Sequence, residues 1–286
     1  MKFQTGAPVW RLSGGDGKNE LDRNEHVRYK GGMKQDHSPA ARPSSHASSG
    51  PASRRERPAK VALTRELIVA TALDILNEEG LEKVTMRAIA GRLDTGPASL
   101  YVYVRNTEDL HAQLLDALIA GVPEAAAERP GASVDAADWR GQLIGLLMTY
   151  TERLYSHPAI ARLSLFARSN GPNSLRMADA LLKLLRQGGV ADASAAWAID
   201  LMMHFATATA AEQSSDQHES KIAATADAIE AADPALYPNL AAIDPLLLFS
   251  GDGLERYTWA VNVLIDGVLT AVPPTPDTSR LAFKRD

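Results

Sequence analysis

A short stretch of the chain carries side chains suited to contacting base edges and phosphate oxygens of DNA. Between Gly96 and Arg105 the sequence reads PASLYVYV, and at helical spacing only Leu100 and Val104 fall on a core side. The others are predicted to point outward: Pro97, Ala98, Ser99, Tyr101, Val102 and Tyr103. Serine can bond a base edge or a phosphate, tyrosine can donate to phosphate, and alanine or valine can meet a thymine methyl group. Exposed apolar and aromatic side chains indicate a surface that binds something.

The element before this surface is predicted to be a short helix, with Thr85 placed to cap its start. Its apolar side chains recur at helical spacing: Met86, Ile89, Ala90 and Leu93. A tight turn follows, in which Asp94 and Gly96 both tolerate positive φ, and Pro97 suits the first turn of a new helix. Helix, short turn and helix with an exposed face is the helix-turn-helix pattern, whose second helix enters the DNA major groove.

Two more helices are predicted around this pair. The first runs from about Arg65 to Glu79, between the cap Thr64 and the terminating Gly80, with a core stripe of Ile68, Ala72, Ile75 and Leu76. After a turn at 105–107, Thr107 is expected to cap a further helix with acids in its first turn. Its apolar side chains would pack against both halves of the molecule: Leu110, Leu114, Leu115, Leu118 and Ile119.

The charge is unevenly divided along a chain whose net charge is −5. Residues 1–60 hold 12 Lys and Arg against 6 Asp and Glu, a net of +6, whereas residues 61–122 hold 5 against 9, a net of −4. Attraction to phosphate must therefore come from local cations, which are Arg87, Arg92 and Arg105, and from the basic cluster at 54–60. That cluster is either a solvated tail or an arm that adds phosphate or minor-groove contacts.

Composition favours a soluble protein in the cytoplasm. The 286 residues include no cysteine, which excludes disulfides and thiolate zinc sites. No apolar run reaches the ~20 residues that span a bilayer, and the start lacks the apolar core of a signal peptide, so we expect no membrane contact. We expect a disordered basic tail over 1–60, a helix-turn-helix domain over 61–122, a helical domain over 123–272 and a flexible tail over 273–286.

The second domain is predicted to begin with a loose linker from Pro123 to Ala137. Apolar helical segments follow at about 139–156, 159–168, 174–187, 192–214 and 254–271, with a weak helix at 222–231 and a proline-containing loop after it. The segments at 192–214 and 254–271 are apolar around most of their girth, which indicates burial on several sides. A two-fold interface that pairs these helices with those of a second copy would bury them.

The stretch from Leu63 to Leu118 resembles the DNA-binding domain of the tetracycline repressor (TetR) family. That resemblance implies an all-α homodimer that represses transcription until a small molecule binds its C-terminal domain. By position it also implies DNA contacts from Arg87, from Arg105 and from the outward face, namely Pro97, Ala98, Ser99, Tyr101, Val102 and Tyr103. Two positions depart from the family pattern: Asp94 replaces a common turn glycine, and Thr107 replaces a frequent phosphate-binding lysine.

An effector pocket is expected among the C-terminal helices, although apolar and aromatic candidates of this kind are more often plain core. The candidates are Trp139, Leu143, Leu147, Tyr150, His157, Phe166, Trp197, Met203 and Glu212. His157 and Glu212 resemble, by position, residues near the drug-bound magnesium of the family's tetracycline-binding member. Trp139 and Leu143 stand where that protein hydrogen-bonds the drug, so we expect a hydrophobic or aromatic effector, with no metal and no cofactor.

The leading hypothesis is therefore a ligand-responsive repressor that binds palindromic double-stranded DNA as a homodimer. One alternative is an all-α enzyme acting on a hydrophobic small molecule, but no nucleophile, metal or glycine-loop motif supports it. His204 and Glu212 are the only conceivable acid–base pair, and we expect no catalytic residue. Another alternative is an activator of the same fold.

Overall fold

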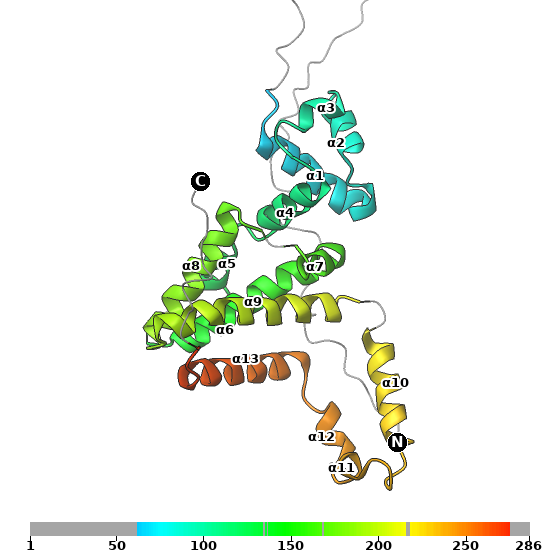
Figure 1. Cartoon of the computed structure of the whole chain (residues 1–286), viewed down its shortest axis with the longest axis vertical. Coiled ribbons are helices and arrows are strands. Elements are labelled where there is room, and N and C mark those ends of the chain that lie inside the picture. Colours follow the sequence, from blue (N-terminus) through cyan, green and yellow to red (C-terminus); the bar gives the residue numbers. More distant parts are fainter. Residues whose placement is uncertain (1–61, 134, 136, 168, 216–217, 275–286) are drawn as a thin grey trace, which may run out of the picture. The chain divides into compact units, whose positions relative to one another are not determined.

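The computed structural model describes residues 62–133, 135, 137–167, 169–215 and 218–274, and within them every regular element is a helix (Figure 1). The prediction of an all-α protein is thereby confirmed. The basic tail over 1–60 and all but the start of the C-terminal tail lie outside the described residues. The helices are α1 (Arg65–Glu79), η3 (Leu81–Lys83), α2 (Met86–Arg92), α3 (Pro97–Leu100), α4 (Thr107–Leu118), α5 (Val122–Ala127), α6 (Trp139–Tyr155), α7 (Pro158–Ser164), α8 (Pro172–Gln187), α9 (Asp192–Gln213), α10 (His218–Glu230), α11 (Pro238–Ala241), α12 (Pro245–Phe249) and α13 (Gly253–Thr270).

The helices α1 to α3, which we call the head, follow local sequence signals. The Thr64 side chain accepts from the Leu67 amide at the start of α1, and Gly80 ends that helix at φ +88°. The predicted bounds of α1 and its buried stripe are confirmed. The Thr85 side chain likewise accepts from the Ala88 amide, at 3.1 Å, so it caps α2 as predicted.

The turn between α2 and α3 differs in detail from the prediction. Asp94 adopts positive φ, at +47°, whereas Gly96 is extended at φ −81°. Only one residue of the turn therefore needs the left-handed region, which an aspartate tolerates. The Thr95 amide closes the turn with a 2.9 Å hydrogen bond to the Ala90 carbonyl.

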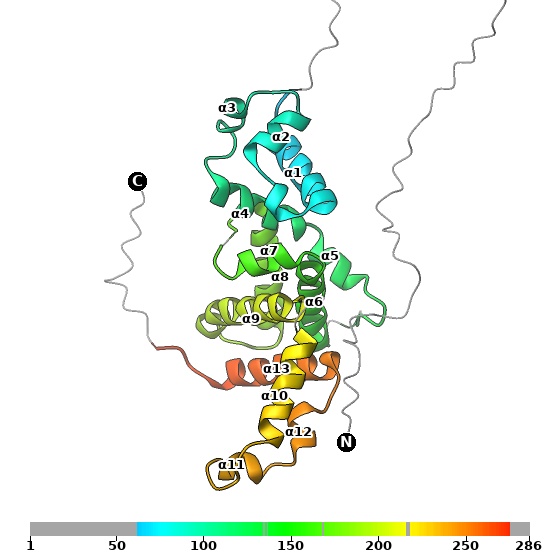
Figure 2. The ribbon, with the colours of Figure 1, turned by 90° about the vertical axis from the view of Figure 1, so that its right-hand side faces the viewer.

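The helix α4 connects the head to the remaining helices (Figures 1 and 2). Its cap is Asn106, whose side chain accepts from the Asp109 amide at 2.8 Å, so the prediction of Thr107 as the cap is wrong by one residue. Leu110 and Leu114 are fully buried in one continuous core with Ile68 and Ile75 of α1. The head is thus fixed to the first half of α4.

The expected loose linker over 123–137 is wrong in its first part, where the structure has α5. Gly121 turns the chain at φ +71°, and Val122 and Ala126 are then buried, with α5 packed against α6. A segment of alanine, glutamate and proline carries little hydrophobic periodicity of its own. Its helix is stabilised by the α6 surface, which no local pattern reveals.

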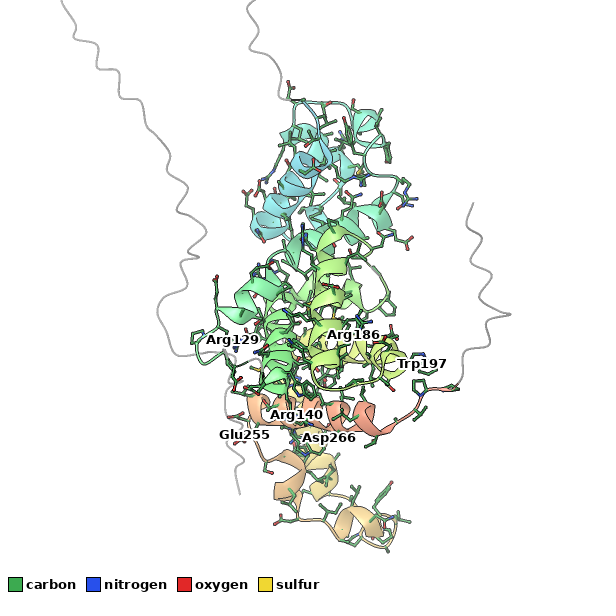
Figure 3. All side chains as sticks on the ribbon, turned by 90° about the vertical axis from the view of Figure 1, so that its left-hand side faces the viewer. Arg129, Arg140, Arg186, Trp197, Glu255 and Asp266 are labelled. Carbon is green, nitrogen blue, oxygen red and sulfur yellow. The ribbon has the colours of Figure 1, made fainter. Side chains whose placement is uncertain are left out.

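The C-terminal helices form a second packed group, in which α6 and α9 lie together and α7, α8 and α13 pack on them. Helices are confirmed at each predicted site, with ends shifted by up to four residues. Arg140 of α6 bonds Asp266 of α13 at 2.7 Å, and the two side chains lie beside each other in Figure 3. The expected loop after α10 instead holds α11 and α12, which lie on the side of α13 away from α9 in Figures 1 and 2.

Candidate nucleic-acid interface and ligand cavity

The surface of α3 is held outward by two buried anchors. Leu100 and Val104 are both fully buried, while Tyr101 and Val102 between them are 53% and 81% exposed. The exposed positions, which we call the reading surface, are Pro97, Ala98, Ser99, Tyr101 and Val102. Because α3 proper ends at Leu100 and the chain continues in a turn, the surface spans slightly more than one helical turn.

Tyr103 behaves differently from the other predicted contact residues. Its ring packs partly against the core, so the expectation of a fully outward tyrosine is wrong. In an α-helix, Tyr103 would lie three residues from Leu100, on nearly the same side. The Tyr103 ring is therefore partly buried, although the sequence pattern predicted that it would point outward.

The three arginines predicted to attract phosphate, Arg87, Arg92 and Arg105, are in different electrostatic states. Arg92 bonds both Glu78 and Glu79, at 2.6 Å each, which raises the pKa of its guanidinium. Arg105 is largely exposed, with its Nε 3.7 Å from a carboxylate oxygen of Asp109. Arg87 is exposed near the start of α2. Arg87 and Arg105 are thus the better placed cations for phosphate, while the charge of Arg92 is committed to α1.

A cavity of about 350 Å³, the α4–α9 cavity, lies where α4, α6, α7, α8 and α9 meet. Leu115 and Ile119 of α4 form one wall, and hydroxyl, imidazole and carboxylate groups join the apolar lining. The lining is Leu115, Ile119, Tyr150, Ser164, Leu165, Phe166, Ala167, Ser169, Ser174, Ala178, Ala196, Ile199, Asp200, Met203, His204 and Thr207. Inside it, the Tyr150 hydroxyl lies 3.0 Å from the Thr207 hydroxyl, and burial raises the tyrosine pKa, so the phenol stays protonated at neutral pH.

Three of the nine candidate effector residues line this cavity: Tyr150, Phe166 and Met203. Phe166 is largely exposed, which places it at the cavity mouth. Six candidates lie outside it: Trp139, Leu143, Leu147, His157, Trp197 and Glu212. Leu143 and Leu147 are fully buried core, Trp139 packs over Gly188, and Glu212 is exposed.

Two of these six candidates point elsewhere for identifiable reasons. His157 directs its Nε2 to the Asn77 side chain of α1, at 3.0 Å, so it links the head to the start of α7. Trp197 is 58% exposed and projects outward from α9 (Figure 3). Of the conceivable acid–base pair, His204 lines the cavity and Glu212 does not. The geometry thus gives no support to a joint catalytic role for the two.

The polar lining residues Ser164, Ser169 and Asp200 were missed by sequence reasoning. They stand in no motif, and only the packing of α7, α8 and α9 brings them together. A second cavity of about 520 Å³, the α5–α8 cavity, lies between α5, the 129–133 segment, α6 and α8. It shares no lining residue with the first.

Two properties of the described residues bear on other functions. They contain no group of three or more His, Cys, Asp or Glu side chains placed to hold a metal ion. Within the same residues, no helix combines the length and apolar character needed to cross a membrane.

Comparison with known proteins gives matches over both groups of helices. Residues 68–114 match the family model for bacterial regulatory proteins of the tetR family, and residues 133–272 match that for the tetracyclin repressor-like C-terminal domain. The class C tetracycline repressor protein of Escherichia coli is 28% identical over 159 residues, which cover 56% of this chain and 70% of that protein.

Solved structures of Streptomyces proteins show the same similarity. SCO7704 from Streptomyces coelicor, described as a candidate transcription regulator, is 44% identical with a TM-score of 0.61, over 75% of this chain and 98% of that one. The TetR family protein ActR of Streptomyces coelicolor, in complex with actinorhodin, is 32% identical with a TM-score of 0.59, over 73% of this chain and 96% of that one.

Proposed function

The chain belongs to the TetR family of bacterial regulatory proteins, and on this premise we propose that it is a ligand-responsive transcriptional repressor. In this proposal a homodimer binds a palindromic operator and releases it when a small molecule occupies the α4–α9 cavity. The observation that carries the proposal is the reading surface, where exposed side chains stand between the fully buried anchors Leu100 and Val104. A DNA-bound regulator of this kind works in the cytoplasm, where bacterial DNA lies.

We assign the DNA contacts by the chemistry of each exposed group. Arg87 can bond guanine bidentately or grip a phosphate, and Ser99 can bond a base edge or a phosphate. Ala98 and Val102 can meet thymine methyl groups, and Tyr101 can donate to phosphate. Pro97 is the first residue of α3 and would lie against the DNA backbone, and Arg105, which follows α3, would contact phosphate. Tyr103 contributes less to binding because its ring packs partly on the core.

We propose that the second copy binds the outer faces of α9 and α13. Trp197 and Leu201 of α9 are exposed, and Trp259 of α13 is 70% exposed with Val263 and Leu269 near it on the same helix. Large apolar side chains exposed together indicate a protein interface. A two-fold dimer would place two reading surfaces about 34 to 36 Å apart, one turn of DNA, which is why the operator should be palindromic.

The effector we propose is a hydrophobic or aromatic compound with a few polar groups. Leu115, Ile119 and Met203 provide apolar contacts in the α4–α9 cavity, while Tyr150 and Thr207 provide hydroxyls. The crystal structure of the relative ActR in complex with actinorhodin supports a ligand-binding role for this fold. Leu115 of α4 lines the α4–α9 cavity. A compound bound there can therefore displace α4 and, through it, the head.

Selection of the full-length protein on a random duplex DNA library tests the proposal. We expect a palindrome to be enriched, and Tyr101→Ala and Arg87→Ala to weaken binding by roughly 5- to 150-fold, the effect of 1 to 3 kcal/mol per contact. Tyr237→Ala is the matched control, since that tyrosine is 52% exposed, as Tyr101 is at 53%, but lies before α11.

Enrichment of no palindrome, or equal binding by all three variants, would contradict the assignment. A reporter gene placed behind the selected operator separates the repressor from the activator alternative, because the repressor lowers expression.

A further inference from the structure

Asp116 is a buried carboxylate of α4 whose side chain bonds entirely to groups outside its own helix. Its Oδ1 accepts from the Ser169 hydroxyl at 3.1 Å and from the Ser174 amide at 2.8 Å. Its Oδ2 accepts from the Asn173 amide at 3.3 Å and from the Asn173 side-chain nitrogen at 3.2 Å. The same Asn173 nitrogen also donates to the Asp116 carbonyl at 3.0 Å. These contacts fasten the second half of α4 to the start of α8.

The helix α8 obtains its N-terminal cap from Asp116 because its own sequence supplies none. Amides of the first helical turn have no acceptor within the helix. Gly171, at the cap position, has no side chain, and Pro172 has no amide proton. A carboxylate at this end is also favoured by the helix dipole. The cap of α8 therefore comes from a helix more than 50 residues earlier in the chain.

Gly171 shows how closely the two helices approach. A Cβ atom at this position would overlap the Asp116 carboxylate group. The φ of Gly171 is −76°, which any residue can adopt, so the glycine is needed for space rather than for backbone freedom. The contact between α4 and α8 is thus tight on both sides.

The Asp116 contact and the α4–α9 cavity share a wall. Ser169 and Ser174 both line the cavity, and so do Leu115 of α4 and Ile119, the C-cap of that helix, which stand before and after Asp116 in the chain. A compound that fills the cavity therefore touches residues on both sides of the contact. A compound that accepts a hydrogen bond from the Ser169 hydroxyl also competes directly with the Asp116 carboxylate for that proton.

The other half of α4 is fixed to the head, because Leu110 and Leu114 are fully buried in a core shared with α1. A displacement of the Asp116 end of α4 relative to α8 must therefore move the head, and with it the reading surface. We infer that Asp116 is a positioning residue, whose contact with α8 holds the head in its DNA-binding orientation until the cavity is filled. This inference rests on the proposed function.

The isosteric substitution Asp116→Asn tests the inference, because it replaces one acceptor by a donor that faces other donors. Removing a negative charge from α4 should by itself strengthen attraction to phosphate. If Asp116 positions the head, the substitution should instead weaken binding. We expect the affinity for the selected operator to fall by about fivefold or more, which lies within the range of allosteric coupling free energies. Glu108→Gln makes the same charge change at an exposed position of α4 and should bind as tightly as the wild type or tighter.

Two further variants separate positioning from general destabilisation. Gly171→Ala disturbs the same contact from the α8 side and should weaken operator binding in the same direction. Ala178→Phe, which places a ring in the cavity, should weaken binding in the wild-type background but by less than twofold in the Asp116→Asn background. All measurements are made at a temperature where thermal unfolding shows each variant to be folded.

The outcomes distinguish the two proposals. A wild-type chain that selects no palindrome overturns the proposed function and this inference with it. A wild-type chain that binds, with Asp116→Asn and Gly171→Ala binding equally well or tighter, overturns the inference alone. Full additivity of Asp116→Asn and Ala178→Phe also overturns it, since independent effects would show that the cavity does not act through Asp116.

Discussion

A ring built into the α4–α9 cavity should act as a permanent effector. Ala178 lines this cavity from α8, and Leu115 and Ile119 line it from α4 and its C-cap. Ala180, two residues along the same helix, lines the separate α5–α8 cavity. Ala178→Phe and Ala180→Phe therefore add the same ring to the same helix, and only the first adds it to the α4–α9 cavity.

The size of the cavity indicates that the ring can be accommodated. Its volume of about 350 Å³ corresponds to roughly a dozen water molecules at ~30 Å³ each. Burial of a phenylalanine side chain contributes about 1.5 to 3 kcal/mol, and imperfect packing costs about 1 to 3 kcal/mol, so the free energy of unfolding should change little. An allosteric coupling of about 1 to 3 kcal/mol would weaken operator binding by roughly 5- to 150-fold.

Fluorescence anisotropy with the selected operator measures binding, and thermal unfolding checks that both variants are folded. We expect weakened binding for Ala178→Phe and less than a twofold change for Ala180→Phe. Equal weakening in both variants would refute the assignment of the effector site to the α4–α9 cavity. Tighter binding by Ala178→Phe would refute release and would identify the natural occupant as a co-repressor.

Two further predictions concern stability. Thr85→Ala removes the 3.1 Å cap bond to the Ala88 amide and should lower the free energy of unfolding by about 1 kcal/mol, measured by chemical denaturation; an unchanged midpoint would show that the cap contributes nothing. Burial lowers the pKa of both His111 and His157 from the usual 6.5, so the unfolded chain takes up protons that the folded chain refuses. Stability should therefore fall as the pH drops from about 7 to 5, by less than about 1.4 kcal/mol per pH unit for each histidine. His157→Gln should flatten this dependence, and a stability that is constant or rises on acidification would contradict the reasoning.

The sequence predicted the head accurately because its signals are local. Thr64, Gly80 and Thr85 set helix ends through hydrogen bonds or dihedral angles within a few residues of themselves. Leu100 and Val104 are separated by one helical turn, so the burial of one side of α3 and the exposure of the other follow from spacing. The partial burial of Tyr103 was missed because this residue follows α3, and its contact with the core depends on how the neighbouring core residues pack.

The effector side was predicted only in outline. Apolar spacing indicated helices at the positions of α6 to α9 and α13, but it could not distinguish core from cavity wall. Leu143, Leu147, Leu115 and Ile119 are all aliphatic residues at apolar positions of a helical pattern. Leu143 and Leu147 are fully buried in the core, whereas Leu115 and Ile119 line the α4–α9 cavity. Which side remains open depends on how several helices meet, and that information is not local.

By itself, the sequence determined the head, α4, the helices α6 to α10 and α13, and the reading surface, because caps, turns and apolar periodicity act over a few residues. It did not predict α5, α11 and α12, which lie in segments expected to be linker or loop. Only the tertiary structure decided which partners the polar side chains bond. Arg92 is taken up by Glu78 and Glu79, and His157 is turned toward α1. Asp116 is an acid that no sequence motif singles out. A buried carboxylate needs hydrogen-bond donors. Its donors include the amides of Asn173 and Ser174, more than 50 residues away, and Asp116 therefore caps α8.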